Sequence, residues 1–342
     1  MNVLLKCKDN MLNSALLLIC CKIAALSDHQ GITMKNLSIG TLGSPLLLSG
    51  DYKRREAMMV QIGESRIDHL FIADHVSFHN GFGMDGLINA ATLAAMNTEI
   101  TIFLGVYLLA LRHPVLVARQ LSSLCHSAPG RIILGVGLGG EDRHEMEVCG
   151  VDPSKRGKKT NECLKALNQL LSGEPYSHHC EFFDFEDALI KPAPSPGLPI
   201  VVGGRSSAAI RRTAFYGDGW LGVWCSPRRF ADAISEVETT AAENKRRQEN
   251  WLHGMQVWVG FDDDKRKARE ILAREMQDMY QIPFENFEKY CPYGSPEEVA
   301  EYLIPYVENG ATVLNIKPCA VDDETEIERV SEVCRLIRME VE

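Results

Sequence analysis

The segment LSIGTLGSP, residues 37–45, decides between two fold classes. Its first six residues form a short apolar run of strand length. An open, doubly wound sheet needs a G-x-G-x-x-G phosphate loop directly after its first strand, and this segment, whose only glycines are Gly40 and Gly43, does not fit that fingerprint. A closed barrel makes no such demand, so the segment favours a barrel if strands and helices alternate after it.

This alternation continues along the chain. Runs of strand length with apolar or β-branched character occupy residues 37–42, 69–73, 100–107, 131–136, 199–202, 219–224, 255–261 and 312–316. Helical patterns occupy residues 52–66, 87–96, 114–127, 158–171, 207–216, 228–249, 265–279 and 296–309. Repeated βα units predict a parallel sheet, and this number of repeats predicts the TIM (β/α)8 barrel of the α/β class. The longest non-helical connection, residues 172–198, is predicted to be a small excursion on the barrel rim.

The composition narrows the functional classes. The chain has 342 residues, 45% of them hydrophobic and 24% charged, which is typical of a folded globular protein. A formal net charge of −10 argues against a nucleic-acid partner, which needs a basic face. The 11 cysteines are odd in number and scattered, without a C-x-x-C pair, so we expect a reducing, cytoplasmic setting and no metal site.

Residues 1–33 precede the first strand and are predicted to be an extension outside the fold, with a single domain over residues 34–342. Lys22 interrupts the apolar part, residues 11–26, which is also too short to span a membrane, so we expect no membrane association. A signal peptide is the alternative, but Asp9 intrudes and no small-x-small cleavage site follows. Met34 is then a second candidate for the start of the protein.

Asp74 and His75 follow the second predicted strand. Strand ends meet at the active-site face of a barrel, so both side chains are candidates for a functional site. The carboxylate can accept hydrogen bonds from a heterocycle, and the imidazole titrates near neutral pH. The alternative is structural, with Asp74 bound to loop amides and His75 at the surface.

A glycine-rich run, GVGLGG at residues 135–140, follows the fourth predicted strand. Its glycines would let a cofactor or substrate approach the backbone closely. Glu141 and His144 come next and are candidates for acid–base or cofactor-contacting groups, although an exposed charged turn explains them equally well.

The fifth predicted strand leads into a helix through residues that suit a phosphate. Backbone amides at a helix start, a guanidinium and hydroxyls combine there, and a capped helix with a solvent-facing arginine is the alternative. The residues concerned are Gly203, Gly204, Arg205, Ser206 and Ser207. In the next strand Trp220 and Trp224 share a face, for which core packing is the default.

Taken in order, these motifs resemble the luciferase-like flavin and deazaflavin oxidoreductases. This family of TIM-barrel enzymes includes bacterial luciferase, FMN-dependent monooxygenases and enzymes that use coenzyme F420. The resemblance spans about residues 34–321. Its markers are IADH at 72–75, Gly105 with RHP at 112–114, ARQ at 118–120, GRIILGVG at 130–137, PIVVGGRS at 199–206, GDGW at 217–220 and GSPEEV at 294–299.

The resemblance implies roles for individual residues. Asp74 would contact the flavin or deazaflavin ring, and His75 would lie near its reactive face as a catalytic group. Glu141 would be a catalytic carboxylate and His144 a ring-contacting residue. The resemblance also implies a strand bulge at Val106 and Tyr107, often with a non-prolyl cis peptide, that supports the ring. It further implies a cofactor phosphate site at Gly203, Gly204, Arg205, Ser206 and Ser207.

Two mechanisms fit this resemblance, and both act on a small organic substrate. In the first, which the Asp74–His75 pair slightly favours, F420 exchanges a hydride with the substrate, and His75 or Glu141 handles the accompanying proton. In the second, reduced FMN delivered by a separate reductase reacts with oxygen. A barrel that binds a phosphate ligand without redox chemistry is the alternative from another class. The family resemblance also makes a homodimer the expected assembly.

Overall fold

The computed structural model describes residues 37–43, 50–79, 81, 83–139, 142–246 and 248–341. The predictions for the extension over residues 1–33, for a signal peptide and for Glu141 lie outside these residues.

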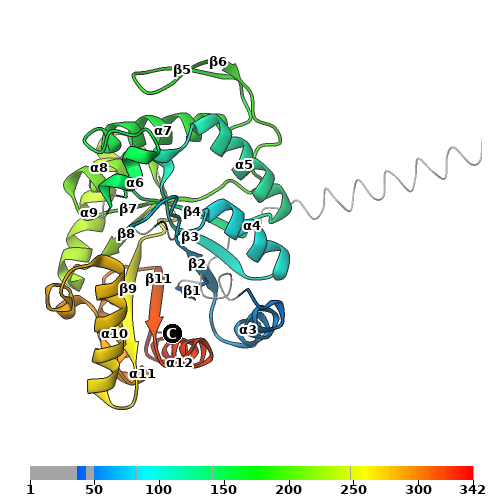
Figure 1. The fold of residues 1–342 in the computed structure, drawn as a ribbon. Coiled ribbons are helices and arrows are strands. Elements are labelled where there is room, and N and C mark those ends of the chain that lie inside the picture. Colours follow the sequence, from blue (N-terminus) through cyan, green and yellow to red (C-terminus); the bar gives the residue numbers. More distant parts are fainter. Residues whose placement is uncertain are drawn as a thin grey trace, which may run out of the picture. The chain divides into compact units, whose positions relative to one another are not determined.

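In the described part of the chain, eight parallel strands close into a barrel, as predicted (Figure 1). The strands pair in sequence order, and the last closes on the first. They are β1 (Ser38–Leu42), β2 (His69–Ile72), β3 (Thr101–Tyr107), β4 (Ile132–Val136), β7 (Ile200–Gly203), β8 (Gly219–Val223), β9 (Gly254–Phe261) and β11 (Val313–Cys319). A short strand, β10 (Tyr293–Gly294), pairs in parallel with the C-terminal end of β9. Because all eight strands are parallel, their C-terminal ends meet at one mouth, where barrel enzymes place their active sites.

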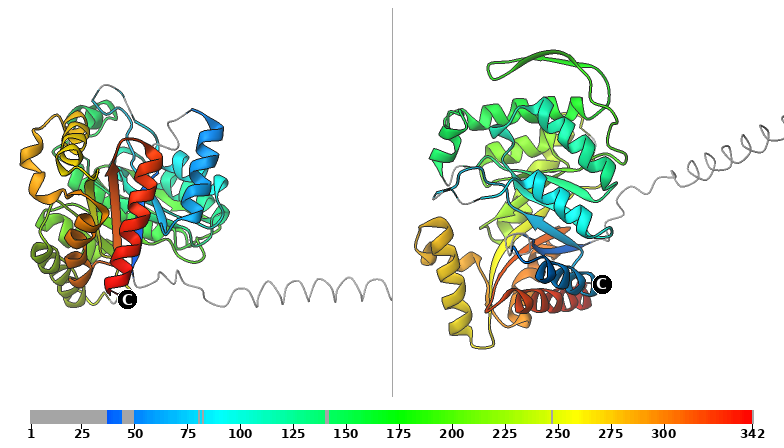
Figure 2. Two further views of the ribbon diagram at one scale, coloured as in Figure 1. Left: turned by 90° about the horizontal axis from the view of Figure 1, so that it is seen from below. Right: turned by 45° about the vertical axis from the view of Figure 1, so that its right-hand side comes forward.

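Helices surround the barrel (Figures 1 and 2). Those that match predictions are α3 (Tyr52–Glu64), α4 (Gly86–Met96), α5 (Pro114–Ser127), α7 (Arg156–Leu170), α8 (Ser207–Tyr216), α9 (Pro227–Glu243), α10 (Lys265–Tyr280) and α11 (Pro296–Glu308). Those that were not predicted are α6 (Arg143–Val148), α12 (Asp323–Val341) and the short 3-10 helices η1 (Leu109–Leu111), η2 (Phe284–Asn286) and η3 (Glu288–Tyr290).

Two corrections concern the helix boundaries. The prediction extended α9 to residue 249, but the helix ends at Glu243 because Asn244 caps it and Lys245 adopts a left-handed φ of 59°. The prediction also placed the eighth helix before the last strand. Both α10 and α11 precede β11, and α12 is the helix that follows it. Its buried Ile327, Val330 and Cys334 have helical spacing and would have revealed it.

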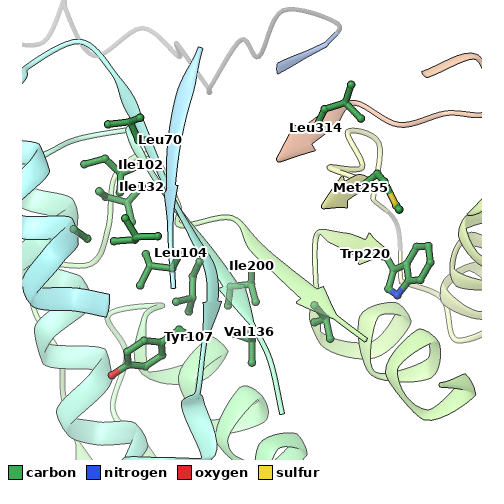
Figure 3. Close-up of a cluster of buried hydrophobic side chains, with 14 of the residues drawn as sticks. Leu70, Ile102, Leu104, Tyr107, Ile132, Val136, Ile200, Trp220, Met255 and Leu314 are labelled. Carbon is green, nitrogen blue, oxygen red and sulfur yellow. The ribbon is translucent and has the colours of Figure 1, made fainter. Parts of the chain in front are cut away.

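Alternating side chains of the strands build two apolar layers. The inner layer fills the barrel with Phe71, Phe103, Ile133, Val201, Leu221 and Val313. The outer layer lies between strands and helices, and Figure 3 shows part of it, from Leu70 and Ile102 to Trp220 and Leu314. Trp220 is only 1% exposed, so the prediction of core packing is confirmed for this residue.

The connection between α7 and β7 contains an antiparallel hairpin of β5 (Tyr176–His179) and β6 (Asp184–Ala188). The hairpin lies outside α7, away from the barrel strands (Figure 1). Its strands were not predicted, because polar residues such as His179 and Asp184 interrupt their apolar pattern. Among the described helices, none combines the length and apolar character needed to cross a membrane.

Candidate active site

Asp74 lies two residues beyond β2, and its carboxylate is fully engaged inside the protein. Arg112 binds it with two nitrogens, Nη1 at 2.5 Å from Oδ2 and Nη2 at 2.8 Å from Oδ1. The amides of Gly86 and Leu108 each donate to it at 2.9 Å. Burial raises the pKa of Asp74, and the Arg112 charge and the hydrogen bonds from these donors oppose this rise. A carboxyl group that accepts four hydrogen bonds, two at each oxygen, must be ionised. Asp74 therefore fastens the start of α4 and the turn after β3 to the end of β2.

His75 pairs with a buried carboxylate that the sequence analysis missed. Its Nδ1 lies 3.2 Å from Oε2 of Glu145, a residue of α6 that is 2% exposed. The amides of Val76 and Ser77 donate to Oε1 of the same carboxylate at 2.7 and 3.3 Å. Glu145 thus holds both the imidazole and the backbone of the loop that follows β2.

This contact determines what His75 can do. Burial by itself raises the pKa of Glu145, but the hydrogen bonds from His75 and the Val76 amide bring it below its ordinary value. An ionised Glu145 accepts a hydrogen bond from Nδ1–H, so Nε2 is the ring nitrogen left to exchange a proton with a ligand. Among the described residues, Nε2 has no hydrogen-bond partner. The pair has the arrangement of an oriented general base.

The remaining predicted residue of this region lies elsewhere. His144 is on the outer side of α6, where its side chain is 70% exposed and faces Glu147 across 3.9 Å. The structure does not bring His144 to His75. The sequence could not show which of these residues faces His75, because Glu141, His144 and Glu145 all follow the glycine run closely. The direction in which each side chain points depends on where α6 begins.

Val106 and Tyr107, at the end of β3, point to opposite sides of the barrel wall. The Gly105–Val106 peptide is cis, and the pairing of β3 with β4 shifts in register between Leu104 and Tyr107. Val106 packs against the inner layer. Tyr107 is 1% exposed and lies in the outer layer (Figure 3). The Arg112 guanidinium lies 4.5 Å from its ring centroid. Of the two, only the side chain of Val106 faces the interior.

The glycine run after β4 makes room for β3. A Cβ on Gly135 would lie 2.1 Å from the carbonyl oxygen of Leu104, and one on Gly137 would lie 2.3 Å from Cγ2 of Val106. These two glycines therefore allow close strand packing at the bulge, and close approach of a ligand to the backbone here stays a prediction.

A pocket of about 140 Å³ lies at the ends of β7 and β8. Of the five residues predicted for a phosphate site, Arg205 lines it. The Ser206 hydroxyl instead caps α8 by accepting from the Ala209 amide, and the Gly204 carbonyl accepts from Nε1 of Trp220 at 2.7 Å. Gly203 packs close to Val106, and Ser207 is an exposed first residue of α8.

Other lining residues were not predicted to belong to a phosphate site. Trp224 follows β8 with a left-handed φ of 47° and lines the pocket together with Trp220. Arg205 lies 5.2 Å from its ring centroid, and Arg229 and Ser226 contribute from the start of α9. Nε1 of Trp224 is buried without a hydrogen-bond partner in the described part of the protein. Two guanidinium groups and an unpaired N–H make a site for an oxyanion.

A third polar group joins the hairpin to α7. Donor atoms of Glu162, His178 and Cys180 lie within 4.8 Å of one another. His178 bonds Glu162 through Nε2 at 3.0 Å and the Tyr176 hydroxyl through Nδ1 at 2.8 Å. The thiol of Cys180 lies 3.4 Å from the carbonyl oxygen of Phe183. Because these donors have partners within the protein, the group explains how the hairpin is attached, and the expectation that the chain has no metal site stays a prediction.

Comparisons with known proteins agree with this architecture. An uncharacterised protein of Mycobacterium tuberculosis is 34% identical over 187 residues, 55% of this chain and 64% of that protein, so the match spans less than two thirds of its length. An F420-dependent glucose-6-phosphate dehydrogenase of Kineococcus radiotolerans is 24% identical over 286 residues, 75% of this chain and 84% of that one.

A solved F420-dependent secondary alcohol dehydrogenase in complex with an F420–acetone adduct shares the fold. It superimposes with a TM-score of 0.77 at 20% identity, covering 88% of this chain and 99% of that one. The model of the family described as luciferase-like monooxygenase matches residues 37–281, well over half of the sequence. The chain therefore belongs to the luciferase-like monooxygenase family.

Proposed function

We propose that this protein is an oxidoreductase that binds F420 or FMN at the mouth of the barrel, with F420 preferred, and transfers a hydride to or from a small organic substrate. The observation that carries the proposal is the pairing of His75 with the buried Glu145 at the end of β2, 3.2 Å apart. Such a pair supplies the proton transfer that accompanies hydride transfer to or from an oxygen-bearing carbon.

The pocket at β7 and β8 suits the phosphate of either cofactor. Arg205 and Arg229 offer guanidinium donors, Ser226 a hydroxyl, and Trp224 an unpaired N–H. A bound phosphate would satisfy that N–H and lie against two positive charges. Val106 provides an apolar contact on the interior side of β3, where the family resemblance places the ring.

Individual residues have different roles in the proposed reaction. The bound cofactor supplies the redox chemistry. His75 accepts or returns a proton at Nε2, while Glu145 holds Nδ1 and stabilises the positive charge when the imidazole is protonated. Asp74 acts through Arg112 and the two amides as a positioning residue, in place of the direct ring contact first expected of it. The predicted roles of Glu141 and His144 have no support from the described residues.

A reduced-FMN-dependent monooxygenase is the second candidate. An aromatic cluster of Trp224, Trp258, Tyr280 and Phe287 lies beside the mouth, next to η2 and η3. Apolar walls of this kind exclude water, which oxygen chemistry on a reduced flavin requires. This function would need a separate reductase. A non-redox phosphate-binding barrel would use the pocket but leave the His75–Glu145 pair without a role.

The cellular setting follows from the same proposal. The eight cysteines in the described residues are all free, which supports a reducing, cytoplasmic location. A homodimer stays a prediction.

Equilibrium titration of the purified chain with F420, FMN and reduced FMN, followed by fluorescence, tests the proposal. We expect the tightest binding for F420. Preference for reduced FMN would select the monooxygenase, and binding of none of the three would contradict the cofactor assignment and leave the non-redox alternative.

A further inference from the structure

The interior faces of β9 and β11 carry polar side chains near the mouth. Gln256 and Trp258 on β9 pair in register with Asn315 and Lys317 on β11. Asn315 is buried, whereas Gln256 and Lys317 keep partial exposure. These two partly exposed polar side chains lie on the same face of neighbouring strands.

A chain of hydrogen bonds determines how Gln256 is oriented. The Ser38 hydroxyl lies 2.8 Å from Nδ1 of His69, and Nε2 of His69 lies 2.7 Å from Oδ1 of Asn315. Burial lowers the pKa of His69 and favours the neutral ring, so Nδ1 accepts from Ser38 and Nε2 donates to Asn315. Asn315 in turn donates through Nδ2 to Oε1 of Gln256 at 3.3 Å.

This direction leaves Gln256 with its amide N–H groups unused. In the described part of the chain its Nε2 has no hydrogen-bond partner. The hydrogen bonds that run from Ser38 through His69 and Asn315 to Gln256 therefore leave Gln256 with a free donor and not a free acceptor.

Lys317 presents the second donor. Its Nζ lies 3.2 Å from the ring centroid of Trp258, whose own Nε1 donates to the Tyr280 hydroxyl at 3.1 Å. No carboxylate among the described residues forms an ion pair with Lys317. Glu275 and Glu326 act on it only at longer range, and Glu326 already accepts from the Ala320 amide at 3.2 Å. The ammonium is held by an aromatic face and lacks a counter-ion.

We infer that Lys317 and Gln256 form a subsite for a carboxylate or phosphate group of the substrate. Both groups are donors, one is a cation, and an anion would supply the counter-charge that Lys317 lacks. The subsite lies on strands β9 and β11. The pocket that holds the other two arginines is elsewhere: Arg205 follows β7, and Arg229 lies at the start of α9, after β8. The assignment of the anion to a substrate, and not to the cofactor, rests on the proposed function.

Anion binding by the full chain without cofactor tests the inference. The parent variant for this test carries Arg205→Gln and Arg229→Gln, which remove the other anion site. Inorganic phosphate and acetate are titrated separately into this variant, and binding is followed by tryptophan fluorescence. Trp258 reports on the subsite because Lys317 touches its ring. We expect saturable binding, and the tighter of the two anions identifies the chemical class.

Adding Lys317→Met should weaken anion binding roughly tenfold to a hundredfold, since a hydrogen bond to a charged group contributes about this much to affinity. Lys317→Arg should retain it, and Gln256→Glu should abolish it by placing a carboxylate beside the ammonium. If Lys317→Met fails to fold, the Lys317→Arg and Gln256→Glu variants still decide. Absence of saturable binding in the parent variant, or equal affinity after Lys317→Met, would overturn the subsite. No cofactor takes part, so this failure is distinct from failure of the F420 or FMN titration.

Discussion

The two sides of the barrel mouth differ in how their charged side chains are paired. At the ends of β2, β3 and β4, Asp74 is bonded to Arg112 and Glu145 to His75, and both carboxylates also receive backbone amides. At the ends of β7 and β8, Arg205 and Arg229 line a pocket without a carboxylate among its lining residues, and Trp224 has a buried N–H without a partner. A side whose charges are paired internally is a rigid frame, and a side with unused donors is prepared to bind an anion.

The largest effect should come from breaking the frame. Arg112→Met leaves the buried Asp74 without its counter-ion, which should lower the free energy of unfolding by about 3–5 kcal/mol. Denaturant unfolding measures this loss. The control is Arg54→Met, which removes the exposed ion pair with Asp323 and should cost less than about 1 kcal/mol. Equal costs for the two variants would mean that the frame does not depend on Asp74.

The catalytic prediction concerns Nε2 of His75, which has no hydrogen-bond partner among the described residues. His75→Ala should lower turnover about 10²- to 10⁴-fold while cofactor affinity changes little, because general acid–base catalysis has that weight. Turnover is measured with F420 and a substrate that the unaltered protein accepts in a screen of small alcohols, aldehydes and ketones. His126→Ala, an exposed residue of α5, is the control. Equal turnover in His75→Ala would remove the residue from the mechanism.

On the binding side, single substitutions should act on affinity alone. Arg205→Ala and Arg229→Gln should each weaken F420 binding about tenfold to a hundredfold, with an unchanged melting temperature. Arg228→Gln is a matched control, because Arg228 neighbours Arg229 on α9 and is absent from the pocket lining. If Arg228→Gln weakens binding as strongly, the effect comes from overall charge and the pocket does not hold the phosphate.

The smallest effect is a pH dependence of stability within the frame. The pKa of Glu145 lies below its ordinary value of 4.5, so this carboxylate stabilises the folded state above that pH. The contribution is lost as the pH falls through the lowered value. Glu145→Gln should therefore cost about 1–3 kcal/mol near pH 7, and the difference from the unaltered protein should shrink in acid. Unfolding curves at several pH values would show this, and a difference that stays constant with pH would refute the assignment.

The barrel was predictable from the sequence, because strand length, apolar runs and helical spacing are local properties. All eight strands of the barrel match the predicted runs within three residues at either end. The loop after β2 was also identified, since a strand end is visible as the point where the run Leu70–Ile72 stops. What a local pattern does not contain is the partner of each side chain.

The site shows this limit in two places. Glu145 reaches His75 from α6, 70 residues away, and Arg112 reaches Asp74 across 38 residues. The sequence offered Glu141, His144 and Glu145 within five residues of each other, and only the orientation of α6 distinguishes the last two. Likewise, the sequence does not show that Trp224 adopts a left-handed backbone conformation directly after β8 and lies against Arg205.

The most direct test of the central claim compares ligands with and without their phosphate. FMN and riboflavin, and likewise F420 and its deazaflavin core without the phosphate tail, are titrated against the unaltered chain and against Arg205→Gln/Arg229→Gln. For the ligand pair that the protein binds, we predict that the phosphate tightens binding to the unaltered chain at least about tenfold and has little effect in the double variant. An equal phosphate contribution in both proteins would contradict the claim that the unpaired donors at β7 and β8 hold the cofactor.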